Sequence, residues 1–257
     1  MKRSKITILL AIVLGMTFHS CLDLEPQDQL GGKNMWTSVN DYKQFANTFY
    51  SWTRDFSSVV YDGTHSDKRS DLITYQSYNE FSRGINSIPS SDANYTDNYK
   101  HIRRTNLLLQ NAEAYAKPED IKQYIGEAYF FRAYSYFDLL QLYGDVIITK
   151  KPLDITDPEM KVKRNDRSEV VDLIIDDLNH AVENLPAFKE LTTEEEGRIS
   201  KEGAQAFLSR VALYEGTWQK SRNGNQNTQR SANLLDIAAK AARTVICLLY
   251  TSPSPRD

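Results

Sequence analysis

Cysteine is scarce in this chain: Cys21 and Cys247 are its two cysteines among 257 residues. Two cysteines this far apart in sequence provide no disulfide framework, so packing of an apolar core must stabilise the fold. A surplus of basic residues is lacking as well, because 31 Lys and Arg stand against 34 Asp and Glu, a formal net charge of −3. Since recognition of nucleic-acid phosphates needs clustered Lys and Arg, we expect no nucleic-acid partner.

Sequence motifs of catalysis and metal binding are also missing. The chain contains no G-x-S-x-G, no phosphate-binding P-loop and no G-x-G-x-x-G. Its histidines beyond residue 20, His65, His101 and His180, are too far apart to form an i, i+4 pair of metal ligands. Asp176 and Asp177 are neighbours on a predicted helix and point in different directions, so they cannot flank one glycosidic bond together. The residues therefore give no sign of a catalytic or metal site, and we expect no metal or cofactor, although carboxylates far apart in sequence leave a glycosidase as an open alternative.

The amino terminus lacks the run of about 20 apolar residues that a transmembrane helix needs. Its apolar run covers only residues 6–16 and follows three basic residues, which is the pattern of a cleavable secretory signal. Cys21 comes directly after Ser20, and this junction resembles a bacterial lipobox, in which the cysteine becomes the lipidated first residue of the mature chain. We predict a lipoprotein signal peptide over 1–20, lipidation at Cys21 and a polar tether over 21–34. The alternative is an ordinary signal peptide that carries an incidental cysteine.

Apolar residues at helical spacing predict six helices and an all-α fold. Short connections between several of them favour stacked antiparallel pairs like those of TPR repeats, although no strict repeat can be recognised. Two longer connections, 53–92 and 145–165, lack a helical period, and the second begins with DVIIT, which allows a short strand. The predicted helices cover residues 39–52, 93–116, 118–143, 166–185, about 200–214 and 231–246.

Several helix ends carry capping signals in the sequence. Ser38 stands where an N-cap would, and Asp166 with Glu169 has the spacing of a capping box. Gly144 ends a periodic segment, which is the usual place of a left-handed C-cap, and Pro186 stops the fourth helix. These signals predict helix ends independently of the apolar pattern.

The last eleven residues, CLLYTSPSPRD, break the pattern of the amphipathic helix before them. The segment resembles translated sequencing-adapter read-through, so we interpret 247–257 as a non-native tail and exclude it from the predicted fold. The helical domain is then predicted over 35–246, and we expect the natural chain to continue beyond it.

The segment IGEAYFFRAYSYFDLLQLYGDVIIT, residues 125–149, resembles the GEA-x-FLRA…LYGDVP signature of the SusD/RagB family. Three further segments resemble helices of this family in the same order along the chain. Ile147 departs from the signature, because the family often has proline there, and this puts only the local turn in doubt. The resemblance covers residues 21–246 and corresponds to the amino-terminal half of the family's fold. The three segments are NMWTSVNDYKQFANTFY, RNDRSEVVDLIIDDLNHAVENLP and GRISKEGAQAFLSRVALYEG.

This resemblance implies a nutrient-binding lipoprotein of the Bacteroidetes outer membrane. Such proteins are all-α with TPR-like helix pairs, are not enzymes, and cap a SusC-like TonB-dependent transporter, to which they deliver a nutrient, usually a glycan. Asp23 and Glu25, just after Cys21, resemble a surface-export signal of such lipoproteins, with a solvated linker as the alternative. The expected location is the outer membrane, lipid-anchored and exposed at the cell surface. Two other functions stay open: a lipid-anchored TPR-type scaffold that binds protein, and a lipid-anchored carbohydrate hydrolase.

Glycan binding needs aromatic rings for the apolar faces of sugars and polar side chains for their hydroxyls. Residues 61–99 contain this mixture of Tyr, Phe, Asp, Asn and Arg. We predict that some of four residues in this stretch bind the ligand; the alternative is that its tyrosines pack the loop onto the helices. The four residues are Tyr75, Tyr78, Arg83 and Asn86. The aromatic residues Phe130, Phe131, Tyr136 and Phe137 are expected to pack in the core, and Trp36 and Trp52 are expected to have packing roles as well.

Overall fold

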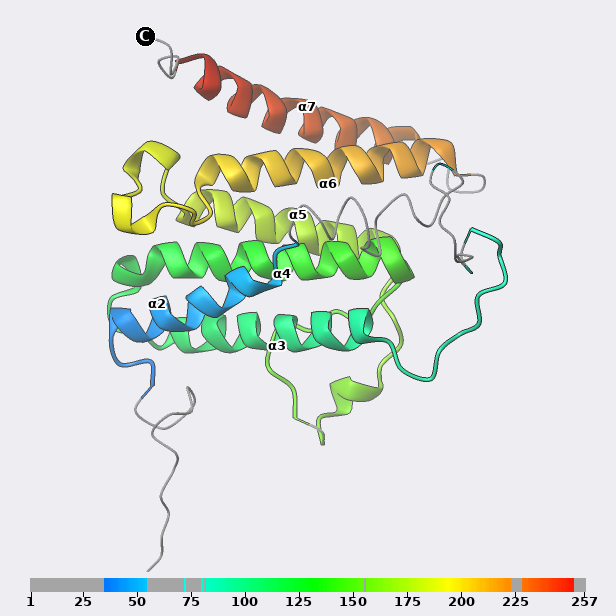
Figure 1. Cartoon of the computed structure of the whole chain (residues 1–257), viewed down its shortest axis with the longest axis horizontal. Helices are drawn as coiled ribbons and strands as arrows, with labels where there is room; N and C mark the ends of the chain where they lie inside the picture. Colours follow the sequence, from blue (N-terminus) through cyan, green and yellow to red (C-terminus); the bar gives the residue numbers. More distant parts are fainter. Residues whose placement is uncertain are drawn as a thin grey trace, which may run out of the picture. The chain divides into compact units, whose positions relative to one another are not determined.

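A computed structural model of the chain describes residues 35–54, 72, 80, 82–154, 156–222 and 228–251, with side chains up to Cys247. From Trp36 onward these residues belong to one unit. Helices α3 to α7 lie side by side in chain order, and α2 crosses α3 and α4 (Figure 1). Within these ranges, none of the helices combines the length and apolar character that crossing a bilayer requires.

The arrangement is the all-α, TPR-like stack that the sequence predicts. Each helix from α3 to α6 packs against the next helix along the chain, and successive helices run antiparallel (Figure 1). In the described part of the chain the DVIIT segment forms an isolated β-bridge, from Val146 to Asn165, and no strand. The helices are α2 (Val39–Asn47), α3 (Ala93–Glu113), α4 (Lys122–Tyr143), α5 (Arg167–Asn184), α6 (Lys201–Ser221) and α7 (Thr228–Thr251). Short 3-10 turns cover Thr48–Trp52, Pro118–Ile121, Pro158–Lys161, Phe188–Glu190 and Thr193–Glu195.

The predicted capping signals are present. The Ser38 hydroxyl accepts a hydrogen bond from the Asp41 amide (3.4 Å), and the Asp41 carboxylate accepts one from the Ser38 amide (2.8 Å), which forms a capping box at α2. Asp166 and Glu169 form the predicted capping box at α5. Gly144 has the predicted positive φ of +72°, but its ψ of −107° lies outside the left-handed helical region.

Some helix boundaries differ from the prediction. The first helix ends as an α-helix at Asn47 and continues as a 3-10 turn, because the hydroxyls of Thr48 and Ser51 donate hydrogen bonds to carbonyl groups three residues earlier. The last helix extends from Thr228 to Thr251, beyond the predicted 231–246. Residues 247–251 of the predicted tail are therefore helical, and their non-native origin stays a prediction.

Helix α4 is the central helix, and it is buried on almost all sides because α2, α3 and α5 all pack against it. The Phe131 ring contacts those of Phe49 and Trp52, with centroid distances of 5.7 and 5.9 Å. These aromatic contacts tie the turn after α2 to α4. The predicted core positions of four aromatic residues are confirmed: Phe130, Phe131, Tyr136 and Phe137 are all buried.

A glycine permits the close approach of α4 to the end of α5. A Cβ atom added at Gly126 would lie 2.9 Å from Leu185 Cγ, closer than side chains can pack. Gly203, in the first turn of α6, has no such neighbour, because the nearest atom to an added Cβ would lie at 3.8 Å. The two glycines therefore serve different purposes, and only Gly126 is required by packing.

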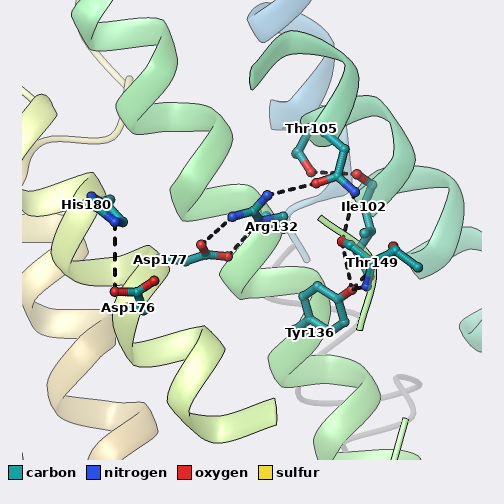
Figure 2. A network of polar contacts seen from close by, with 9 residues as sticks. Ile102, Thr105, Arg132, Tyr136, Thr149, Asp176, Asp177 and His180 are labelled. Carbon is teal, nitrogen blue, oxygen red and sulfur yellow. Dashed lines mark hydrogen bonds and ion pairs between the residues drawn. The ribbon is translucent and has the colours of Figure 1, made fainter. Parts of the chain in front are cut away.

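Within the described part of the chain, three arginine–carboxylate pairs with little exposure join α4 to α5, α5 to α6, and the segment before α6 to α4. Arg132 of α4 donates two hydrogen bonds, of 2.8 and 2.6 Å, to the Asp177 carboxylate of α5 (Figure 2). Asp176 is exposed, so these two adjacent carboxylates point in different directions, as predicted. The other pairs are Arg198 with Glu127 (2.7 Å) and Arg167 with Glu215 (2.9 Å).

Candidate functional site

The amino-terminal half of α3 lies between two hollows. The loop-side hollow, of about 170 Å³, includes Trp52 and Ala93, which flank the long connection 53–92. The segment-side cleft, of about 540 Å³, lies between α3 and the segment 147–160. The loop-side hollow is lined by Trp52, Ala93, Asn94, Asp97, Asn98, His101, Tyr134 and Asp138. The segment-side cleft is lined by Tyr95, Thr96, Tyr99, Lys100, Arg103, Ile147, Thr149, Lys151, Leu153, Glu159 and Met160.

A polar stripe along α3 forms one wall of the loop-side hollow. Its four members recur at i, i+3, i+4 and i+7, a spacing that places side chains on one face of a helix. Because α4 passes beside α3, two residues one turn apart on α4 complete the hollow. The stripe consists of Asn94, Asp97, Asn98 and His101, and α4 contributes Tyr134 and Asp138.

Trp52 and His101 provide an aromatic surface in this hollow. Their rings are stacked, with centroids 4.1 Å apart and an interplanar angle of 14°. Burial lowers the pKa of His101, so its imidazole is uncharged at neutral pH. The Phe49 ring also contacts Trp52, at a centroid distance of 4.7 Å and an interplanar angle of 34°. The predicted packing role of Trp52 is thus confirmed, and the same ring also lines the hollow.

Two carboxylates face the hollow from opposite helices. Asp97 accepts a hydrogen bond from Lys100 (2.8 Å), and this contact lowers the pKa of Asp97. Asp138 forms an ion pair with Arg54, at the start of the long connection. Both carboxylates can accept hydrogen bonds from ligand hydroxyls, because each has more acceptor positions than one cation occupies.

The amino terminus of α3 is capped by a third carboxylate. One oxygen of Asp92 accepts a hydrogen bond from the Asn94 amide (2.9 Å), and the other accepts one from the Tyr143 hydroxyl (2.6 Å). This cap places a negative charge at the positive end of the helix dipole. The Asp92 carboxylate therefore already compensates the positive partial charge at the amino terminus of α3.

The segment-side cleft has a wall that is held in place by side chains of α3 and α4. The Tyr99 hydroxyl both donates to the Ile147 carbonyl and accepts from the Ile147 amide, each at 2.9 Å. The Tyr136 hydroxyl accepts from the Thr149 amide at 2.8 Å (Figure 2). Asn106 donates to the Thr149 carbonyl at 2.9 Å. These contacts fix an extended stretch of backbone that has no neighbouring strand in the described part of the chain.

The surface of the segment-side cleft is mainly apolar, with balanced charges at its rim. Tyr95 and Tyr99 have centroids 4.8 Å apart, and their rings line the cleft together with Ile147, Leu153 and Met160. The rim carries three ion pairs, in which each basic side chain of the lining binds a carboxylate. The pairs are Lys100–Asp97 (2.8 Å), Lys151–Glu159 (2.6 Å) and Arg103–Asp154 (3.6 Å).

A third hollow, of about 350 Å³, lies between α5 and α7. Ile175 of α5 and Leu234 and Ile237 of α7 supply its apolar lining. At its edge Asp172 and Arg230 form an ion pair of 2.7 Å. This groove lies on the stack itself and is not lined by α3.

The predicted ligand-binding residues are only partly described by the structure. Tyr75 and Tyr78 lie outside the described residues, as does the predicted lipidation site Cys21. Arg83 and Asn86 are exposed on the chain that leads to α3, and neither lines one of the three hollows. Their role in binding stays a prediction. Among the described residues, no group of three or more His, Cys, Asp or Glu is placed to hold a metal ion.

Sequence reasoning missed the loop-side hollow, although part of its signal is visible in the sequence. The α3 stripe begins at Asn94 and ends at His101, with helical spacing and without an apolar residue. When a helix also has an apolar face, such a stripe indicates that its other face presents polar side chains to solvent or to a ligand. The stacking of His101 on Trp52 could not be read in this way, because the two residues belong to different elements.

The sequence was compared with families of known proteins. A SusD-like family model, described as "Starch-binding associating with outer membrane", matches residues 22–213. The SusD-like protein P38 of Formosa agariphila is 28% identical over 233 residues, which are 83% of this chain and 42% of the relative. The SusD-like protein P2 of the same organism is 28% identical over 238 residues, 86% of this chain and 45% of the relative. The chain thus spans less than half the length of the curated relatives it matches.

Solved structures agree with these relatives. A SusD-like protein of Bacteroides fragilis has a TM-score of 0.65 and 25% identity, over 86% of this chain and 40% of that one. A second B. fragilis structure, a SusD-like carbohydrate binding protein, has a TM-score of 0.60 over 83% of this chain and 41% of that one. Its identity of 20% supports the fold alone. Family model, relatives and fold agree, and the chain belongs to the SusD-like family.

Proposed function

We propose that this chain is part of a lipid-anchored, surface-exposed protein of the outer membrane that binds a glycan and delivers it to a SusC-like TonB-dependent transporter. The observation that carries the proposal is the set of side chains in the loop-side hollow. Stacked aromatic rings, two carboxylates and two amides converge there. Aromatic faces suit the apolar faces of sugar rings, and carboxylates and amides suit their hydroxyls. Membership of a family described as starch-binding supports the same ligand class.

The connection 53–92 is proposed to supply the rest of the ligand contacts. Trp52 precedes this connection and Ala93 follows it, and both line the hollow. Residues of the connection are therefore tethered at both ends to the proposed site. On this basis Tyr75, Tyr78, Arg83 and Asn86 remain the proposed contributors of additional aromatic and polar contacts.

Binding can be tested by isothermal titration calorimetry with soluble starch, laminarin and xyloglucan. We expect one of these glycans to bind, and His101→Ala and Asn94→Ala to weaken the binding, because both residues line the hollow. Gln229→Ala is the control, since Gln229 bonds to a side chain on its own helix, α7, and lines none of the three hollows. Equal affinity of all variants would place the ligand elsewhere, and a protein that binds none of the glycans would refute the proposal.

The site is proposed to bind glycans without cleaving them. Glycoside hydrolysis needs one carboxyl group with a raised pKa, which donates a proton to the leaving oxygen. The contact with Lys100 lowers the pKa of Asp97 instead, which disfavours that role. We expect no reducing ends to be released from any glycan that binds, and their release would support the hydrolase alternative.

Anchor and partner require measurements in cells. Cys21→Ser is expected to abolish lipid labelling and to release the protein from the membrane fraction. A tagged chain is expected to co-purify with a TonB-dependent transporter, and protease added to intact cells is expected to cleave it.

A periplasmic scaffold is the second candidate, and the groove between α5 and α7 is the observation in its favour. TPR-like stacks present such grooves to peptide segments. Complete protection from protease in intact cells, with cleavage after the outer membrane is opened, would favour this candidate over the first.

A further inference from the structure

We infer that the loop-side hollow selects uncharged glycans and discriminates against carboxylated or sulfated ones. The inference rests on the proposed function, because it concerns the ligand class of the same site. It comes from the side chains that line the hollow, whose charged members are acidic, and from the contacts that the nearby cations already make.

The charged side chains that line the hollow are acidic. Asp97 contributes one carboxylate from α3 and Asp138 contributes another from α4. Among the described residues of the lining, none is Lys or Arg. His101 is uncharged at neutral pH, because burial lowers its pKa. A ligand therefore meets hydrogen-bond acceptors that carry negative charge.

The nearby cations already bind groups of the protein. Lys100 binds Asp97, and Arg54 binds Asp138. Arg104, one turn further along α3, donates to the Thr48 hydroxyl (2.9 Å) and covers the Phe45 ring, at 4.7 Å from its centroid. An anionic sugar would have to compete for these cations, whereas a neutral sugar would not.

The positive end of α3 does not offer an anion site either. The dipole of a helix favours anions at its amino terminus, but here the Asp92 carboxylate accepts the Asn94 amide. A sugar carboxylate or sulfate at this end would meet a negative charge.

Hydroxyl groups suit this environment for a simple reason: each can donate a hydrogen bond to a carboxylate. Ionised carboxylates and sulfates can only accept, so in the hollow they would face other acceptors of the same charge. Repulsion between charges a few ångströms apart is large enough to reduce binding about tenfold at low salt. Salt weakens the effect, because the screening length falls to about 10 Å at 0.1 M.

The test compares each neutral glycan with its own charged derivative. Isothermal titration calorimetry at low salt uses soluble starch, laminarin and xyloglucan, and the carboxymethylated form of each at equal repeat-unit concentration. We expect a neutral form to bind about tenfold more tightly than its carboxymethylated form, with the difference shrinking as salt is added. Equal or tighter binding of the carboxymethylated form would overturn the inference and leave the proposed function intact. Absence of binding to every neutral and charged form would overturn both.

A matched pair of variants assigns the discrimination to the hollow. Asp97→Asn removes one carboxylate with little change of shape, and it is expected to reduce the preference for the neutral form several-fold. Asp236→Asn is the control, because Asp236 forms a comparable exposed pair with Lys240 (2.6 Å) on α7. Circular dichroism confirms that both variants are folded. An unchanged preference in folded Asp97→Asn, or an equal change in the control, would contradict the assignment to this site.

Discussion

Removal of Arg132 is the most informative perturbation of the fold, because this residue joins three elements in the core. Its guanidinium donates hydrogen bonds to both oxygens of Asp177, at 2.8 and 2.6 Å, and to Asn106 Oδ1 at 2.8 Å. Arg132 is 5% exposed and Asp177 is fully buried. Arg132→Met keeps much of the side-chain volume and leaves the Asp177 carboxylate without its cation.

The expected loss of stability is about 3–5 kcal/mol, the range measured when one partner of a buried ion pair is removed. Three charge-assisted hydrogen bonds disappear, and the uncompensated carboxylate stays in a site from which water is excluded. Since small proteins are stable by only about 5–15 kcal/mol, such a loss would be visible as a large fall of the denaturation midpoint. The exposed pair Lys240–Asp236 supplies the control: Lys240→Met is expected to cost less than about 1 kcal/mol.

The cost of Arg132→Met is expected to depend on pH. Burial raises the pKa of Asp177, and Arg132 is the main group that opposes this rise. Without Arg132 the folded variant therefore holds a proton at pH values where the unfolded chain, with a pKa of about 3.9, has lost it. Stability then falls as pH rises through this window, by up to about 1.4 kcal/mol per pH unit. The variant should be closer to the parent protein at pH 5 than at pH 7.

Urea denaturation followed by circular dichroism, at pH 5 and pH 7, measures both effects. The double variant Arg132→Met/Asp177→Leu removes the charge as well as its partner, and it is expected to recover most of the stability. Two results would refute the reasoning: a cost below about 1 kcal/mol for Arg132→Met at pH 7, or a double variant that is less stable than either single variant.

Four further substitutions test the packing, the wall of the segment-side cleft and a helix cap. Gly126→Ala is expected to destabilise the fold by about 1–3 kcal/mol through overpacking, whereas Gly203→Ala should stabilise it by about 0.5–1 kcal/mol; thermal denaturation measures both. Tyr99→Phe removes the partner of the Ile147 amide, and it should cost about 1–3 kcal/mol and speed hydrogen exchange at that amide. Ser38→Ala removes the cap of α2 and should cost about 1 kcal/mol in urea denaturation.

Each of these expectations has a clear contrary outcome. Equal effects at Gly126 and Gly203 would show that close packing of α4 does not depend on glycine. Unchanged exchange at Ile147 would show that the segment is held by other contacts. A neutral result at Ser38 would show that the helix end is held by its aromatic contacts instead of its cap.

The helical layout could be predicted from the sequence because its signals are local. Apolar spacing placed each of the six helices, and the Ser38 and Asp166 caps placed helix starts to the residue. Less well predicted was the end of the first helix, where hydroxyl groups of the turn after Asn47 compete for backbone carbonyls. Whether a hydroxyl takes a backbone carbonyl depends on the rotamer of its side chain. Rotamers cannot be deduced from the order of residue types alone.

The buried ion pairs and the loop-side hollow could not be predicted, because their partners are distant in sequence. Glu127 and Arg132 stand in the segment that resembles the family signature, yet their partners Arg198 and Asp177 lie on other elements. The sequence pattern shows charged residues on a largely apolar helix, but it does not show which residues they bind. For ligand binding, the sequence predicted contributors within residues 61–99, and the hollow that we propose as the site is also lined by Trp52 and Ala93, at the two ends of the connection 53–92.

The wall of the segment-side cleft is positioned through its backbone, and this has a consequence for sequence variation. The shorter hydrogen bonds that hold it end on amide and carbonyl groups of Ile147 and Thr149, and the Thr149 side chain adds only a 3.5 Å contact with the Tyr136 hydroxyl. Substitutions at 147, 149 and 151 other than to proline therefore leave these bonds in place and alter the surface shown to the cleft. A proline at 147 would keep the carbonyl bond to Tyr99 and remove the amide bond. The side chains that must be kept to hold this backbone in place are those of Tyr99, Asn106 and Tyr136. Point mutations other than to proline can thus change the chemistry of this cleft wall while its backbone hydrogen bonds are retained.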